Sequence, residues 1–113
     1  MEAAMIKPKN LLYKLGIYSY FVGHHYLLYG ISLIQQDSSY LFSVTTRLYP
    51  TIAAHFGKGK AAVESGIRNS IERFWLSGNR RLFYRMIGYE RKEQPSNREF
   101  FAILIDFLNK ENG

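Results

Sequence analysis

Residues 48–79, LYPTIAAHFGKGKAAVESGIRNSIERFWLSGN, decide the fold of this 113-residue chain. The stretch begins with a short apolar segment, passes through a turn at GKGK, and continues in a longer segment whose apolar residues recur every three or four positions. This order is typical of a helix-turn-helix, whose second helix enters the major groove of DNA.

Local signals support both helices. Pro50 suits the first turn of a helix, because its missing N–H has no intrahelical partner there. Ile52, Ala53 and Phe56 follow at helical spacing, and Gly57 suits the end of that helix, where a positive φ is needed. The sequence therefore predicts a short helix that ends at Gly57, with Gly59 extending the turn.

The second helix is predicted to have one apolar and one polar stripe. The apolar stripe holds Val63, Ile67, Ile71, Phe74 and Trp75, and the polar stripe holds Ala61, Glu64, Ser65, Arg68 and Glu72. The first apolar pair of this helix is Val63 and Ile67, and Gly66 lies between them. The spacing of this pair is one residue wider than is usual in a helix-turn-helix. We therefore expect an altered turn or crossing. Two amphipathic helices with a glycine turn also occur in other helical bundles, and Glu64–Arg68 can be a simple exposed i,i+4 pair.

Outward from this motif, capping residues and glycines mark further helices. The signals predict a helix from Asn10 to Gly16, a second over about 23–36, and a third over 40–48 that is capped by Ser38 or Ser39. They also predict a helix over 80–87 that ends at Gly88. A last helix is capped by Ser96, with Glu99 at the capping-box position. Residues 1–9 are expected to be a frayed start, and 77–79 a turn. No alternating strand pattern is sustained. The fold class predicted is all-α: one compact domain of about six helices over residues 1–113, with an ordered core at about 10–110.

Charge is concentrated in and after the second helix of the motif. The chain has a formal net charge of +6, and residues 58–98 hold ten Lys/Arg against four Asp/Glu. Such a basic zone attracts phosphates whatever the base sequence. It can also be a plain solubility charge. The chain has no cysteine, no apolar run long enough to span a bilayer and no signal-peptide pattern. We expect a cytoplasmic, nucleoid-associated protein without a membrane partner.

Catalytic and metal-binding patterns are weak. His24 and His25 are adjacent and would diverge on a helix, and His55 is distant, so no metal site is predicted. The GKGK turn lacks the spacing of a phosphate-cradling loop, and paired carboxylates are missing. We expect no enzyme and no cofactor. The many aromatic residues suit core packing better than stacking on single-stranded bases.

In the order in which they occur, several segments resemble the C-terminal DNA-binding domain of the sporulation-initiation response regulators. They are LLYKLGI (11–17), GHHYLLYGISLI (23–34), TTRLYPTIAAHF (45–56), VESGIRNSIE (63–72), WLSGN (75–79), IGY (87–89) and QPSNREFFAILID (94–106). The resemblance implies an all-α domain that binds a short box of double-stranded DNA, with copies on adjacent boxes forming tandem homodimers.

The resemblance also implies roles for single residues. Glu64 and Arg68 match base-contacting positions, whereas Ala62 and Ser65 replace arginines and Asn69 replaces a histidine. Glu64, Arg68, Ser65 and Asn69 are therefore the predicted base contacts, and Lys58, Lys60 and Arg73 the predicted phosphate contacts. Residues 77–89 match a segment linked to contact with RNA polymerase.

The regulators of this family carry a phosphorylated receiver domain that this sequence lacks. The chain is either a fragment of a longer protein or a stand-alone paralogue. We expect the second, which would be controlled by its abundance or by a partner. The leading hypothesis is a sequence-preferring transcription regulator. The alternative is a protein-interaction module that kept the fold and binds another regulator or RNA polymerase. The missing arginines and an exposed Phe74 would argue for it, although Phe74 can equally be part of the core. A non-specific nucleoid protein is the third possibility.

Overall fold

The computed structural model describes residues 5–113, and its elements are all helical. Residues 5–113 form six α-helices, α1 to α6. A 3₁₀ segment, η1, and a π segment, η2, connect α2 to α3. Their bounds are α1 Pro8–Leu15, α2 Val22–Gln36, η1 Ser38–Phe42, η2 Val44–Leu48, α3 Tyr49–Phe56, α4 Lys60–Ser77, α5 Arg80–Ile87 and α6 Asn97–Asn112. Residues 5–113 contain no strand. The predicted all-α fold of about six helices is confirmed.

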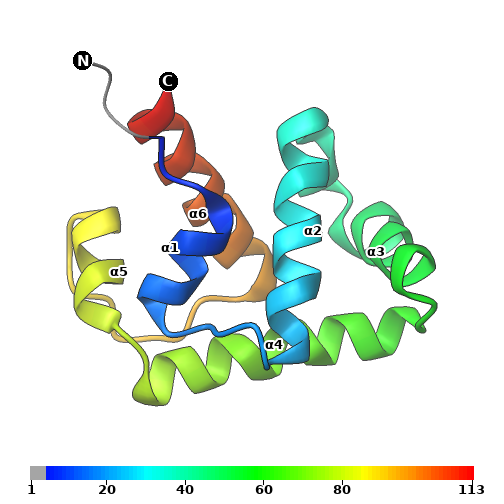
Figure 1. The fold of residues 1–113 in the computed structure, drawn as a ribbon, viewed down its shortest axis with the longest axis horizontal. Helices are drawn as coiled ribbons and strands as arrows, with labels where there is room; N and C mark the ends of the chain where they lie inside the picture. Colours follow the sequence, from blue (N-terminus) through cyan, green and yellow to red (C-terminus); the bar gives the residue numbers. More distant parts are fainter. Residues whose placement is uncertain (1–4) are drawn as a thin grey trace.

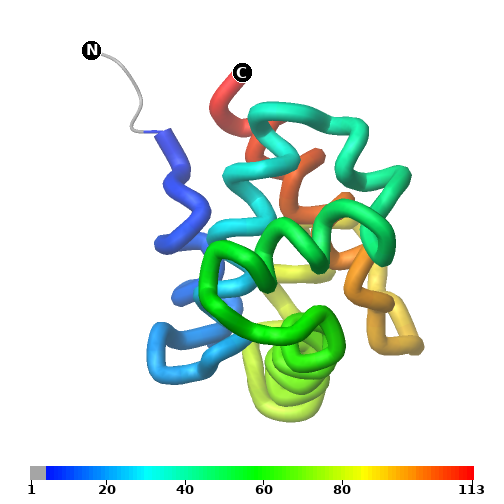
Figure 2. The backbone as a smooth tube through the Cα atoms, turned by 90° about the vertical axis from the view of Figure 1, so that its right-hand side faces the viewer, coloured from blue at the N-terminus to red at the C-terminus, as the bar shows by residue number. Residues whose placement is uncertain are grey.

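The longest helix, α4, forms the base of the molecule, and the other helices stand on one side of it (Figure 1). Figure 2 looks nearly along α4 and shows that the two ends of the described chain lie at the opposite end of the molecule. One face of α4 therefore packs on the protein, and the other is left to solvent.

The core joins α4, α5 and α6 through a group of aromatic rings. The ring of Phe74 on α4 lies 5.3 Å from that of Phe83 on α5 and 5.5 Å from that of Phe100 on α6, centroid to centroid. All three side chains are fully buried. The interpretation of Phe74 as an exposed interface residue is therefore wrong, because its ring fills the space between the last three helices.

Two predicted helix starts are also wrong. Helix α1 begins at Pro8 rather than at Asn10, since proline is well suited to the first turn. Residues 40–48 do not form one helix. The Asp37 side chain, rather than Ser38 or Ser39, accepts the capping hydrogen bond, from Ser39 N, and the backbone breaks at Ser43 before the π segment begins. The other predicted ends are confirmed, including Gly16, Gly57, Gly88 and the capping box of Ser96 and Glu99.

The chain start is fixed to the chain end. Ile6 N donates to Asn112 Oδ1 at 2.7 Å, and Asn112 Nδ2 donates to Ile6 O at 2.8 Å. The expectation of a frayed start therefore fails at Ile6 and at Pro8, where α1 begins, while residues 1–4 lie outside the part that the structure describes.

Candidate nucleic-acid interface

Helices α3 and α4 are joined by a short turn that requires glycine at one position. Gly57 has a φ of 65° and a ψ of 39°, a left-handed conformation that ends α3. Gly59 is in extended conformation immediately before α4. The turn holds Lys58 and leads into Lys60, and both lysines are exposed. The predicted phosphate contacts Lys58 and Lys60 therefore lie together at the start of α4.

The exposed face of α4 carries the predicted base contacts. Arg68 and Asn69 are exposed, whereas Glu64 and Ser65 are half-buried. Arg68 Nη1 donates to Glu64 Oε1 at 3.1 Å, and Ser65 Oγ donates to Ala62 O at 3.3 Å. The side chains of Arg68 and Glu64 remain 52% and 45% exposed, so the pair is accessible to a ligand. Glu64 thus orients the Arg68 guanidinium on the exposed face of α4.

A bridge from α6 fixes α3 and α4 relative to each other. Asn97 Nδ2 donates to Tyr49 Oη of α3 at 2.9 Å and to Glu64 O of α4 at 3.1 Å. Burial raises the pKa of the Tyr49 hydroxyl, so this group stays protonated at neutral pH. We name Asn97, Tyr49 and Glu64 the helix clamp. In the sequence, Asn97 lies 48 positions from Tyr49 and 33 positions from Glu64. No local sequence pattern therefore indicated the helix clamp.

The loop before α6 is held by Arg91, whose side chain points back to the protein. Arg91 Nη2 donates to both carboxylate oxygens of Glu99 at 3.0 Å, and Arg91 Nε donates to Glu93 O. The hydrogen bond from Ser96 N is the main reason that the pKa of Glu99 is lowered, and Arg91 adds to the effect. This loop lines a shallow groove with Glu64 and Arg68 on one edge of α4.

Arg73 lies at the other edge of α4. Its guanidinium carbon is 4.0 Å from the centre of the Phe21 ring, which comes directly before α2. The structure therefore separates the predicted phosphate contacts, with two lysines at the start of α4 and Arg73 on the side of α2. It does not gather the seven predicted residues into one cluster.

Gly66 sets the crossing of α2 over α4. A Cβ atom at Gly66 would lie 2.9 Å from Tyr26 Cε2, and one at Gly23 would lie 2.3 Å from Gly66 O. The two backbones approach so closely that neither position has room for a side chain. Gly66, between the apolar residues Val63 and Ile67, therefore lies at a close crossing of α2 and α4.

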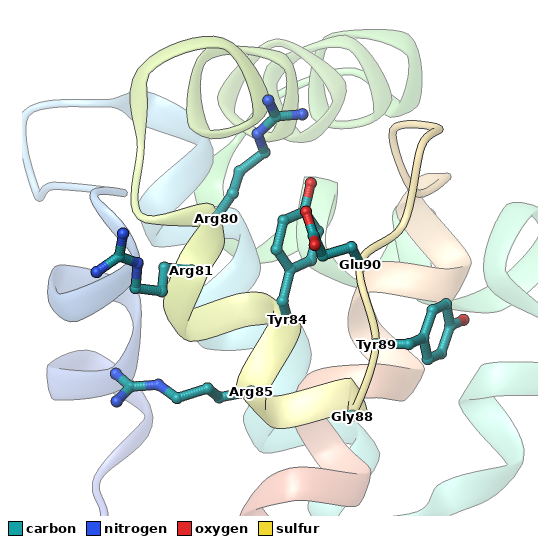
Figure 3. A pocket seen from close by; sticks show the side chains of 7 residues that line it. All are labelled: Arg80, Arg81, Tyr84, Arg85, Gly88, Tyr89 and Glu90. Carbon is teal, nitrogen blue, oxygen red and sulfur yellow. The ribbon is translucent and has the colours of Figure 1, made fainter.

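Helix α5 adds a basic surface beyond the end of α4. Arg81 and Arg85 extend from the same side of α5, while Arg80 runs toward α4 (Figure 3), where its guanidinium lies 4.5 Å from the centre of the Trp75 ring. Tyr84 Oη donates to Arg91 O and joins α5 to the following loop.

No group of three or more His, Cys, Asp or Glu side chains suited to a metal ion occurs within residues 5–113. None of the helices in that range combines the length and apolar character needed to cross a bilayer. His24 is buried with Nδ1 2.9 Å from Ile17 O, and burial lowers its pKa. His25 is exposed, with Nε2 2.7 Å from Ser19 O.

The all-helical fold and the short turn that joins α3 to the long helix α4 have the arrangement of a helix-turn-helix domain. Residues 9–108 match the family described as "Sporulation initiation factor Spo0A C terminal", and the chain belongs to that family. It is a family of DNA-binding effector domains linked to sporulation and transcription regulation, and not a class of enzymes.

Proposed function

We propose that this chain is a sequence-preferring transcription regulator that places α4 in the major groove of double-stranded DNA. The observation that carries the proposal is the exposed face of α4, where Arg68 is oriented by Glu64 close to Ser65 and Asn69. Helix α4 has 18 residues and is about 27 Å long, so its exposed face can enter the groove while the opposite face packs against α2 and α3.

In this arrangement the base contacts come from residues 64–69 of α4. Arginine donates two parallel hydrogen bonds to guanine, and asparagine pairs similarly with adenine. Arg68 and Asn69 supply these two groups, and Glu64 and Ser65 complete the set. Ala62 and Ser65 are small and leave space against the base edges. The preferred box should therefore carry fewer strongly fixed positions than an arginine-rich helix would read.

Phosphate contacts surround this centre. Lys58 and Lys60 are exposed at the start of α4, where the partial positive charge of a helix N-terminus adds to their own. Residues 5–113 contain no carboxylate within ion-pair distance of either lysine. Both ammonium groups are thus available to the DNA backbone.

Contact with RNA polymerase is proposed for α5. Its arginines are exposed, and the region matches the segment that the family resemblance links to polymerase. Two copies on adjacent boxes would place their α5 surfaces along the same duplex. The alternative of a protein-interaction module without DNA reading is weakened, because Phe74 is core and not an exposed anchor.

The test is a selection of bound duplexes from a random pool at about 150 mM salt, where non-specific phosphate binding is suppressed. One enriched short motif would support a sequence-reading regulator. Retained duplexes without a motif would mean a non-specific binder. No retained duplex, together with capture of a purified polymerase subunit, would favour the interaction module.

A further inference from the structure

An aromatic loop borders the exposed face of α4 on the side of α2. It consists of residues 18–21 of the connection between α1 and α2, together with Val22, the first residue of α2. Tyr20 is 78% exposed, Val22 56% and Tyr18 39%, although all three are large side chains. Figure 1 shows this connection reaching α4 at the foot of α2. An exposed aromatic group beside a ligand-binding helix calls for a function of its own.

Several contacts within the protein hold the loop in place. The rings of Tyr18 and Tyr20 are stacked with centroids 5.7 Å apart, and the rings of Tyr20 and Phe21 meet edge to face at 4.8 Å. Ser19 anchors the loop through its hydroxyl, which lies 2.7 Å from Tyr13 Oη, and through its carbonyl, which lies 2.7 Å from His25 Nε2. A surface fixed in this way loses little conformational entropy on binding.

The groups that the loop presents suit an anion. Within residues 5–113, no hydrogen-bond partner is found for the hydroxyl of Tyr18 or Tyr20, so both can donate. The cation of Arg73 lies over the Phe21 ring, and no described carboxylate is within ion-pair distance of it. Residues 3–36, which include the loop, contain neither Asp nor Glu. The segment that forms the loop therefore brings no carboxylate that would repel an anion.

The position of the loop identifies the anion. The exposed face of α4 is bordered on one side by the loop before α6, next to Glu64 and Arg68, and on the other by the aromatic loop, next to Arg73. A helix with its side chains is about 10–12 Å wide and the major groove is about 12 Å wide, so the elements on either side of a bound helix meet the two phosphate backbones.

We propose that the aromatic loop is a second DNA contact, in which the hydroxyls of Tyr18 and Tyr20 and the guanidinium of Arg73 bind phosphates along one wall of the groove. Tyrosine hydroxyls and arginine are both common donors to phosphate oxygens. This inference rests on the proposed function, since it takes α4 to lie in the groove. It adds a contact that positions the helix and reads no base.

The test compares matched variants by fluorescence anisotropy on the enriched duplex and on a scrambled one. Tyr18→Phe combined with Tyr20→Phe removes the two hydroxyls and keeps the rings. We expect affinity to fall about three- to tenfold on both duplexes, with the salt dependence unchanged because no charge is lost. Arg73→Gln should lower affinity on both and reduce the salt slope by about one. Tyr89→Phe, at an exposed tyrosine beyond α5, is the control.

Ethylation interference on the same duplex locates the contact. The wild type should require phosphates on the wall that faces the loop, and the double tyrosine variant should lose that requirement while keeping all others. Affinity and interference indistinguishable from the wild type would overturn the loop contact and leave the proposed function standing. A wild type that retains no duplex would overturn both.

Discussion

Arg68 and Lys60 lie on the same helix but serve different parts of a DNA contact. Arg68 is held at 3.1 Å by Glu64, while Lys60 extends from the first position of α4. Exposed ion pairs contribute little to folding. Replacing either cation should therefore change binding and leave the free energy of unfolding nearly unchanged.

Arg68→Ala should cost about 1–3 kcal/mol on the preferred duplex and relax the preference at one base pair, because a bidentate base contact is lost. The measurement is a repeated selection followed by titration of single-base variants of the box. Arg85→Ala removes the same charge from the exposed surface of α5 and is the matched control. An unchanged motif for Arg68→Ala would exclude this docking of α4.

Lys60→Ala should weaken binding to all duplexes alike and reduce the salt slope by about one, since a phosphate contact carries no base information. Affinity is to be measured at several salt concentrations on the preferred and a scrambled duplex. Lys110→Ala is the control, because Lys110 pairs with Asp106 on α6, far along the chain from α4. A loss confined to the preferred duplex would contradict the phosphate assignment.

Between elements, the closest approach is that of α2 and α4. Gly66→Ala would bring a Cβ to 2.9 Å from the Tyr26 ring, and overpacking of this kind costs roughly 1–3 kcal/mol. Urea unfolding measures the loss. Gly59→Ala is the control, because a Cβ there meets nothing within 4 Å. Equal free energies of unfolding for the two variants would mean that the crossing can relax.

The helix clamp should connect stability with binding. Asn97→Ala removes two hydrogen bonds and should lower the free energy of unfolding by about 1–3 kcal/mol. It should also weaken specific more than non-specific DNA binding, because α4 would no longer be fixed against α3. Asn109→Ala, at an exposed position of the same helix, is the control. An unaltered ratio of specific to non-specific affinity would show that the clamp only supports folding.

Helix ends were predictable where one residue decides them. Gly57 ends α3, and Ser96 with Glu99 starts α6, because the signal lies within four residues of the end. Residues 40–48 were not predictable, because their apolar spacing fits a helix while the Asp37 cap and the break at Ser43 override it.

Candidate site residues were predictable only as positions on one helix face. Their pairing was partly local, as for Glu64 and Arg68, four residues apart. The contact of Arg73 with Phe21 and the bridging role of Asn97 depend on residues brought together by folding. The spacing of apolar residues along the sequence does not predict contacts between residues that are distant in the chain.

For the molecule as a whole, His24 makes stability depend on pH. Its pKa is lowered from 6.5, chiefly by burial. The unfolded chain therefore takes up the proton first as pH falls. The contribution of His24 to the free energy of unfolding is complete above pH 6.5 and declines as the pH falls below that value. Glu99, whose pKa is lowered from 4.5, adds a second decline below 4.5.

Urea midpoints measured between about pH 7.5 and 5 should show the first decline. His24→Asn keeps a donor near Ile17 O, removes the titrating ring and should flatten this part of the curve. His55→Asn, at an exposed position, should leave the decline in place. A decline that persists in His24→Asn would assign it to another group.

The reciprocal pair of Ile6 and Asn112 brings both ends of the described chain to the pole opposite α4 (Figure 1). A dye, tag or fusion partner joined at either end would therefore emerge away from the DNA-facing helix. A donor and an acceptor fluorophore, one at each end, would lie close together in the folded state and separate when the chain opens. The same arrangement makes the protein a candidate for circular permutation, with a short linker closing the old ends and new ends opened in the loop before α6.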